Sequence, residues 1–365
     1  MNEYLSAARR LLAYLYNKHW NGQALYGPDP IGRINWRITR FVRSYTRWLP
    51  WRDHYEYAQG QGYWIKALAR FHQQTTDENA LRSLRQAADY LIAKQLPNGA
   101  WEHPPLRERR GFVSAVETIW ACLGLAAAYE TTGSPAYLES LLRGYASLAD
   151  IIGFQKVLGG LAVNYYAHSR HAVPNVTTMF LWLKAVIHKL TGESHALENV
   201  DEMVRFLEIS QLDSGELSYV YDEIPHFQCF QYNSFQFIDL ANFYIITTNE
   251  RVYSLMIRMA RFLYTGISGR NSCRYNCFRE NPEVNYWTSA LAAALRIADQ
   301  LELCEYSGAS DRLFQHVLRQ QRPDGSFWFS QRNYLILSDR RSYPRQQAMI
   351  LDALLQRSAQ QDIQV

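Results

Sequence analysis

Polar side chains stand at the start of several long, otherwise apolar stretches of this 365-residue sequence. His, Tyr and carboxylate side chains are the groups that most often give or take a proton in enzymes. Capping of free backbone N–H groups is the simpler explanation for any one Asn or Gln at a helix start. The whole set recurs at five or six equivalent points and predicts a polar site: Gln59, Gln61, Glu117, His171, Asn175, His226, Gln228, Gln231, Tyr232, Asn233, Asn285, Tyr286, Tyr343, Arg345 and Gln346.

Arginines gather in the segments before these stretches, although the whole chain carries a net charge of only +4. Salt bridges on a solvated face account for some of them, but a guanidinium group also binds carboxylates, sulfates and phosphates. Aromatic residues accompany the arginines, and together they suit an acidic sugar chain. The residues expected to bind it are Trp36, Arg37, Gln61, Asn175, Gln228, Asn233, Arg274, Asn285, Arg340 and Arg345.

Two kinds of sugar chemistry fit these residue types. Elimination or epimerisation of a uronic acid needs a cation or amide beside the carboxylate, together with a Tyr or His base. Arg274, Arg340 or Arg345, with one of the amides, could stabilise the developing charge. The candidate bases are His171, His226, Tyr232, Tyr286 and Tyr343.

Glycoside hydrolysis instead needs two carboxylates across the bond that is cleaved. The candidates are Glu117, Asp222, Glu223, Glu280 and Asp339. Glu117 lies one turn inside an apolar stretch, where a buried ion pair is the alternative explanation. Asp339 lies just before the last apolar stretch, where it could simply cap a helix.

The stretches that carry these residues form one of two alternating kinds of predicted helix. Amphipathic helices are predicted at 2–19, 78–95, 135–151, 196–211, 251–265 and 308–321. Nearly apolar helices are predicted at 57–74, 114–131, 173–190, 230–247, 284–301 and 342–357. A helix that is apolar all round is buried on all sides, so the pattern describes an inner and an outer ring.

The connections between the two kinds of helix are unequal. Turns from the apolar to the amphipathic helices are short, whereas the return connections are long: 20–56, 96–113, 152–172, 212–229, 266–283 and 322–341. Segments 215–221 and 325–333 alternate like short hairpins. Long loops at one end of a rigid scaffold usually carry function, so the site is expected on the long-loop face.

A repeated element marks the end of the amphipathic helices. Four copies read Gln-x-x-x-Gly-x followed by Trp, Leu or Phe, and they begin at Gln95, Gln155, Gln211 and Gln321. A degenerate copy is expected near 266–269. The glycine suits a turn with positive φ just after a helix. Although this length would ordinarily suggest two or three domains, a ring of repeats predicts one domain over residues 1–365.

This pattern resembles the (α/α)6 toroids of polysaccharide lyases, unsaturated glucuronyl hydrolases and the helical domain of glucuronyl C5-epimerases. The Gln-x-x-x-Gly-x-Trp element is also similar to the repeat of squalene and hopene cyclases. The resemblance covers nearly the whole chain as architecture, and no catalytic motif of these families is matched. It implies an all-α (α/α)6 toroid with carbohydrate-active chemistry, and the arginine-rich loops predict an acidic polysaccharide or oligosaccharide as the substrate. The absence of a signal-peptide pattern fits a role inside the cell or in exopolysaccharide production.

Two other functions are compatible with such a ring. Terpenoid cyclisation needs an Asp-rich motif, and neither Asp-x-Asp-Asp nor Asp-Asp-x-x-Asp occurs. A non-catalytic module that binds glycans or proteins needs mainly arginine and aromatic residues, which leaves the polar helix starts unexplained. A carbohydrate-active enzyme, either a lyase or epimerase or a glycoside hydrolase, is therefore the favoured prediction.

The remaining features exclude several partners. A charge of +4 without a zinc-finger or RNA-binding motif argues against nucleic acid. The five cysteines show no disulfide pattern, and Cys273 and Cys277 lack the second pair of a zinc motif, so no metal or cofactor is expected. The start of the chain is typical of an amphipathic helix, and the apolar stretches are too short to span a bilayer. A cytoplasmic protein without a membrane span is expected.

Overall fold

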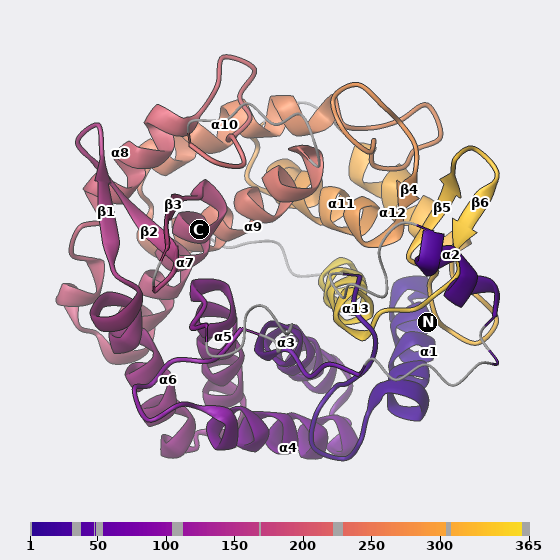
Figure 1. Cartoon of the computed structure of the whole chain (residues 1–365), viewed down its shortest axis with the longest axis horizontal. Coiled ribbons are helices and arrows are strands. Elements are labelled where there is room, and N and C mark those ends of the chain that lie inside the picture. The colour runs from indigo at the N-terminus through magenta and orange to yellow at the C-terminus, as the bar shows by residue number, and fades with distance from the viewer. Residues whose placement is uncertain are drawn as a thin grey trace.

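Two kinds of helix alternate along the chain (Figure 1). The computed structural model describes residues 2–30, 38–46, 48, 54–103, 112–167, 169–221, 229–303 and 308–359. The inner helices are α3 (Ala58–Thr75), α5 (Ala115–Thr132), α7 (Pro174–Thr191), α9 (Cys229–Thr247), α11 (Asn285–Gln300) and α13 (Pro344–Ser358). The outer helices are α1 (Glu3–His19), α4 (Glu78–Lys94), α6 (Pro135–Ser147), α8 (Val200–Ser210), α10 (Glu250–Tyr264) and α12 (Ala309–Arg319).

The inner helices form a closed ring. Each packs against the next along the chain, and α13 packs against α3. Each outer helix covers an inner one, and α1 covers α13 from the opposite end of the sequence. There the Asn2 side-chain amide donates to the Ser358 carbonyl at 3.0 Å. The predicted all-α (α/α)6 toroid is confirmed.

The apolar pattern decides which helix lies inside. The outer helix α10 is amphipathic, and its buried residues recur three and four positions apart: Val252, Leu255, Met256, Met259, Ala260, Phe262 and Leu263. This spacing places them on one side of the helix. The inner helix α5 has no comparable polar side, and all but five of its residues are buried. Because α5 is apolar all round, it is stable only with neighbours on every side.

The repeated Gln-x-x-x-Gly element joins neighbouring outer helices. The Gln211 side-chain amide donates to the Gly215 carbonyl in its own turn at 3.0 Å and to the Leu255 carbonyl of α10 at 3.1 Å. Gln95 and Gln321 make the same pair of bonds, reaching α6 and α1 respectively. The element therefore fastens each turn to the following outer helix.

Only glycine fits these turns. Gly325 has φ +87°, and a Cβ atom there would lie 2.2 Å from the Arg10 carbonyl oxygen of α1. At Gly99 and Gly215 the corresponding distance to an outer-helix carbonyl is 2.4 Å. The repeat is thus required by close backbone packing as well as by the left-handed turn.

The copy at Gln155 differs from the other three. It lies in β1 (Phe154–Val157), which pairs with β2 (Gly160–Tyr166) in an antiparallel hairpin. The two loop residues, Leu158 and Gly159, both have positive φ, as the turn of a two-residue hairpin requires. The Gln155 amide donates to the Asn164 side chain instead of to an outer helix.

The long loops carry further short elements. Strand β3 (Ser169–Ala172) completes one sheet, and β4 (Glu283–Val284), β5 (Ser330–Asn333) and β6 (Leu337–Asp339) form a second. The hairpin expected at 325–333 lies later, over 330–339. Residues 215–221 form no hairpin, and Leu217 alone among them is bridged, to Gln211. The degenerate copy is confirmed, because Ile267 bridges Cys273 in the same way. The other short elements are α2 (Ile38–Tyr45), a π-helix at Leu148–Ile152 and a 3₁₀ helix at Ser194–Leu197.

No described helix is both long enough and apolar enough to cross a lipid bilayer.

Substitution of Gly325 tests the turn packing. Gly325→Ala forces a Cβ atom onto the α1 backbone, whereas Gly133→Ala, at φ +70° with no atom within 4 Å, adds only left-handed strain. Overpacking costs about 1–3 kcal/mol, so Gly325→Ala should lower the free energy of unfolding by about that much more than Gly133→Ala. Denaturant unfolding of both variants measures the difference, and equal losses would contradict the close contact.

Candidate functional site

A polar side chain in the first turns of every inner helix binds the backbone of the loop before it. We call these six contacts the loop clamps. Each clamp residue is the fourth or fifth of its helix, and its side-chain oxygen accepts from a loop N–H. The pairs are Gln61–Leu25, Thr118–Trp101, Thr177–Val163, Asn233–Leu217, Thr288–Cys273 and Gln347–Phe327.

Two residues predicted to bind substrate are loop clamps. The Gln61 amide accepts from the Leu25 N–H at 2.8 Å and donates to the Leu25 carbonyl at 2.7 Å. The Asn233 amide makes the same two bonds to Leu217, at 2.7 and 3.1 Å. Both side chains are almost fully buried. Loop positioning therefore explains these two amides without a ligand.

Arg345 forms a buried ion pair at the start of α13. Its guanidinium binds both carboxylate oxygens of Asp29, with N–O distances of 2.9 and 3.1 Å, and donates to the Gln59 side chain at 2.8 Å. It also lies over the Tyr57 ring, 5.2 Å from the centroid. This bidentate geometry fixes the guanidinium. Asp29 is absent from the set predicted by sequence, because it stands in a Pro-rich loop outside the helix pattern.

Glu117 is buried next to this ion pair. Its carboxylate accepts from the Gln59 N–H at 2.7 Å and so caps the start of α3. Burial raises the pKa of Glu117 to about 7, and the nearby Asp29 charge acts in the same direction. Arg345 and the backbone N–H groups of Gln59 and Ala58 act in the opposite direction. A carboxyl with this pKa is present in both protonation states at neutral pH.

Tyrosines lie around the same end of the inner ring. The Tyr286 hydroxyl accepts from the Gln231 amide at 2.9 Å, and burial raises the Tyr286 pKa to about 12. The Tyr232 ring packs against that of Tyr219 at a tilt of 49°, with ring centroids 4.7 Å apart, and burial raises the Tyr232 pKa well above the usual value. These hydroxyls stay protonated at neutral pH, so in the free protein they are hydrogen-bond donors and not bases.

Asp339 and Tyr343 bind each other. Asp339 is fully buried in β6, where the Arg341 guanidinium donates to both its carboxylate oxygens at 3.0 and 2.9 Å. The Tyr343 hydroxyl donates to Asp339 at 3.2 Å, and burial raises the Tyr343 pKa well above the usual value. Asp339 therefore has an ion pair as well as the local backbone bond from Arg341 that a capping role would give.

Arg340 points outward beside these residues. Its guanidinium lies 4.2 Å from the Tyr45 ring centroid and 5.2 Å from that of Trp328. Arg322 lies over Trp328 as well, at 5.5 Å. Arg340 is exposed and makes no ion pair within the described part of the chain. Two cations and two aromatic rings therefore share one part of the long-loop face.

The other predicted residues are spread over the long-loop face. His171 is exposed on β3. Asn285 donates to the Trp328 carbonyl at 2.7 Å, and Arg274 donates to the Cys277 carbonyl at 3.5 Å. Asn175 lies in the first turn of α7, with a buried side-chain oxygen that has no hydrogen-bond partner. Trp36, Arg37, His226 and Gln228 lie outside the described residues.

Further charges lie inside the ring, deeper along the inner helices. The Lys66 ammonium is 3.6 Å from Asp352 and lies over the Trp120 and Trp182 rings, at 5.2 and 4.4 Å. Burial raises the pKa of Asp239 well above its usual value, and Thr178 donates to it. The charges in these helices are the sequence signal that could have identified them. The cavity that they line has a volume of about 40 Å³, far below the roughly 300–1,000 Å³ of ligand pockets.

Comparisons with known proteins identify the fold and no family. No family model matches the sequence, and no curated protein matches it either. Among solved structures, cellobiose 2-epimerase from Bacillus thermoamylovorans is similar with TM-score 0.72 and 11% identity, covering 98% of this chain and 100% of that one.

Two other structures broaden the range of chemistry. A possible member of the GH105 family from Klebsiella pneumoniae has TM-score 0.68 and 15% identity, covering 98% of this chain and 93% of that one. A type II terpene cyclase from Scytonema has TM-score 0.63 and 13% identity, covering 98% and 97%. The shared toroid therefore accommodates several reactions, and the site must decide among them.

Loss of the Arg345 side chain tests the buried ion pair. Arg345→Ala leaves the Asp29 carboxylate buried without its bidentate partner, which should cost about 3–5 kcal/mol of unfolding free energy. Arg251→Ala removes an exposed pair with Glu208 and should cost about 1 kcal/mol or less. Denaturant unfolding compares the two variants, and a loss for Arg345→Ala no larger than for Arg251→Ala would refute the buried pair.

Glu117 predicts a pH dependence of stability. Its folded-state pKa is raised, so the fold favours the protonated carboxyl; this contribution is complete below the usual pKa of 4.5 and is lost as pH rises through about 7. The loss amounts to about 3 kcal/mol, at about 1.4 kcal/mol per pKa unit. Glu117→Gln should remove that part of the decline in unfolding free energy between pH 4.5 and 8.

The exposed carboxylate of Glu202 provides the control for this titration. Glu202→Gln should keep the wild-type pH dependence. The same decline in Glu117→Gln as in the wild type would show that Glu117 does not titrate with a raised pKa.

Proposed function

We propose that this protein is a carbohydrate-active enzyme that acts on an acidic sugar chain at the long-loop end of the inner ring, with Glu117 as its proton-transfer group. The observation that carries the proposal is the burial of the Glu117 carboxylate at the start of the inner helices, where it accepts from the Gln59 N–H beside the Arg345–Asp29 pair. Burial there raises its pKa to about 7. A general acid or base works best when its pKa lies near the working pH. Structural carboxylates are usually ionised at neutral pH, so this environment suits catalysis.

Elimination or epimerisation is the reaction that the described side chains favour. Hydrolysis needs a second carboxylate, but Asp29 and Asp339 are each bound by a guanidinium group. For elimination, ionised Glu117 would remove the proton next to the substrate carboxylate. The Tyr286 hydroxyl, protonated at neutral pH, would donate a hydrogen bond or a proton to the leaving oxygen.

The acidic substrate is inferred from the rim of the site. Arg340 is exposed beside Tyr45 and Trp328, and Arg322 lies on Trp328 as well. A sugar carboxylate can pair with a guanidinium group while the pyranose ring packs on an indole or phenol ring. Arg345 does not serve this purpose, because its guanidinium is already neutralised by Asp29.

The alternative functions have less support. A cyclised terpenoid needs a large apolar chamber, and the aromatic cavity inside the ring measures only about 40 Å³. A module that only binds glycans has no use for a buried carboxyl with a pKa of about 7, which destabilises the fold at neutral pH. Hydrolysis stays as the second candidate, with Glu117 as the general acid.

The experiment is a panel of uronic-acid glycans incubated with the protein in deuterated water. New ultraviolet absorbance from unsaturated uronates indicates a lyase, and deuterium at C5 without absorbance indicates an epimerase. Reducing ends without either signal indicate a hydrolase. If no glycan in the panel changes, the enzyme proposal is wrong.

Glu117→Gln should reduce kcat by about 10²–10⁴-fold, the usual contribution of a general acid or base. The wild-type rate should change near pH 7, rising with pH if Glu117 is the base and falling with pH if it is the acid. Glu202→Gln, on the outer surface, should keep the wild-type rate. A Glu117→Gln rate within twofold of the wild type would remove Glu117 from the mechanism.

A further inference from the structure

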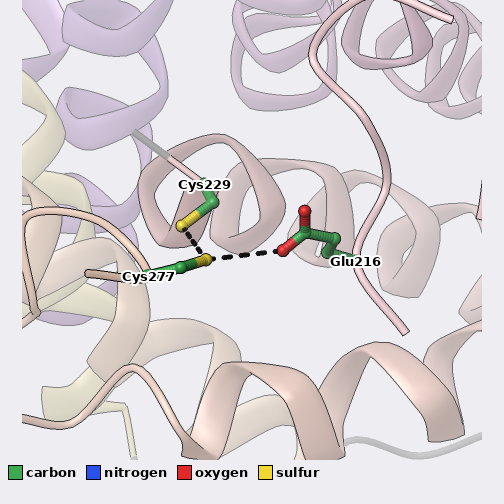
Figure 2. A group of neighbouring side chains, drawn as sticks. All are labelled: Glu216, Cys229 and Cys277. Carbon is green, nitrogen blue, oxygen red and sulfur yellow. Dashed lines mark hydrogen bonds between the residues drawn. The ribbon is translucent and has the colours of Figure 1, made fainter. Parts of the chain in front are cut away.

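Two cysteines and a glutamate converge at the start of α9 (Figure 2). Cys229 is the first residue of α9, Glu216 lies in the loop after α8, and Cys277 lies in the loop between α10 and α11. The Cys229 and Cys277 sulfurs are 2.7 Å apart, and the Cys277 thiol donates to Glu216 at 3.6 Å. One donor atom from each residue lies within 4.8 Å of the other two.

The fold holds these three residues in place from several sides. The Asn233 clamp binds the N–H and carbonyl of Leu217, next to Glu216, and also donates to the Cys229 carbonyl at 2.9 Å. The Thr288 clamp holds the other loop at Cys273. Elements on three sides therefore preorganise the group before any ligand arrives.

The turn that carries Cys277 is fixed separately. The Asn276 side chain accepts from the N–H groups of Phe278 and Arg279, at 2.9 and 2.8 Å. Glu216 and Cys229 are 3% and 5% exposed, whereas Cys277 is half-buried. An ion would therefore be held by two buried ligands and reached from the side of the third.

We propose that Glu216, Cys229 and Cys277 bind a zinc ion. Two sulfurs and one carboxylate oxygen are a donor set that zinc accepts, and three protein ligands leave its fourth position for water or substrate. At Zn–S distances of about 2.3 Å, tetrahedral sulfurs lie about 3.8 Å apart. The two sulfurs, now 2.7 Å apart, must therefore separate by about 1 Å on binding.

The charges around the group fit a bound cation. Zinc binding removes the protons of both thiols, so the bound ion faces two thiolates and a carboxylate, which carry three negative charges. Zinc neutralises two of them. The Arg274 guanidinium donates to the Cys277 carbonyl and has a buried Nε without a hydrogen-bond partner, so a positive charge lies nearby.

A disulfide between Cys229 and Cys277 is the competing explanation. A disulfide would join the two sulfurs, but Cys277 would then have no thiol proton to donate to Glu216. The buried Glu216 carboxylate would lose this hydrogen bond. Zinc uses all three groups, so the position of the carboxylate favours the metal. Cys273 belongs to neither explanation, because it is fully buried and its thiol donates to the Arg274 carbonyl at 3.4 Å.

Zinc content and affinity test the proposal, whether or not the protein acts on sugars. Protein purified under reducing conditions, stripped with a chelator and titrated with zinc should bind one ion per chain and gain thermal stability. Cobalt in place of zinc should show sulfur-to-cobalt charge-transfer absorbance. Cys229→Ser and Cys277→Ser should each abolish this absorbance.

Two further variants complete the test. Glu216→Gln should weaken zinc binding by at least about tenfold, since even residues that merely support metal ligands contribute about 10–100-fold. Cys122→Ser, in the core where its thiol donates to the Leu141 carbonyl, should bind zinc as the wild type does. Equal binding by the wild type and by Cys229→Ser would overturn the proposal. A metal-free protein in which Cys229 and Cys277 form one disulfide-linked peptide pair would do the same.

Discussion

The loop clamps are the interaction on which the long-loop face depends. In the first turns of each inner helix, one side chain accepts a hydrogen bond from a backbone N–H of the loop before that helix. Each of the six loops is therefore fixed to its helix at one point. A buried N–H or carbonyl without a partner costs about 1–3 kcal/mol. Loss of a clamp side chain should therefore destabilise the fold. This cost explains why Gln, Thr or Asn stands at this position in helices that are otherwise largely apolar.

The same clamps fix the loops that carry the candidate functional residues. Asn233 orders the loop that carries Glu216 and the helix end that carries Cys229. Gln61 orders the loop at Leu25, four residues before the Asp29 that binds Arg345. Glu117 then caps α3 from the neighbouring helix. The buried charges therefore lie next to backbone segments that the clamps already fix. Such preorganised surroundings are what an electrostatic site needs.

The sequence predicted the architecture well, because the ring follows from periodic features. Apolar periodicity separated inner from outer helices, and Gln-x-x-x-Gly marked three turns correctly. The copy at Gln155 could not be told apart by its letters, because a two-residue hairpin and a helix end both accept glycine at positive φ. The hairpin in the last long loop lies later than predicted, and its first strand, β5, also pairs with β4 of the preceding loop, a partner that the local sequence does not show.

Less of the candidate site follows from the sequence, since it is built across the ring. Glu117, Tyr286 and Arg345 became candidates because they interrupt apolar patterns. Asp29 has no pattern to interrupt, and Cys229 and Cys277 are too far apart in sequence to form a motif. Gln61 and Asn233 stand out in the sequence, but a sequence does not distinguish an amide that faces a ligand from one that faces its own loop.

The packing of α1 against α13 has a consequence for how the chain is made. The first outer helix leaves the ribosome long before the inner helix that covers its apolar side. At about 5–20 residues per second, synthesis of the intervening chain takes on the order of tens of seconds. During that time α1 lacks its contact with α13, although Tyr16 of α1 can already pack against Trp64 of α3. The nascent protein is therefore an incomplete ring in which apolar surface of α1 stays exposed until α13 is made. The risk of aggregation should be greatest just before α13 emerges from the ribosome.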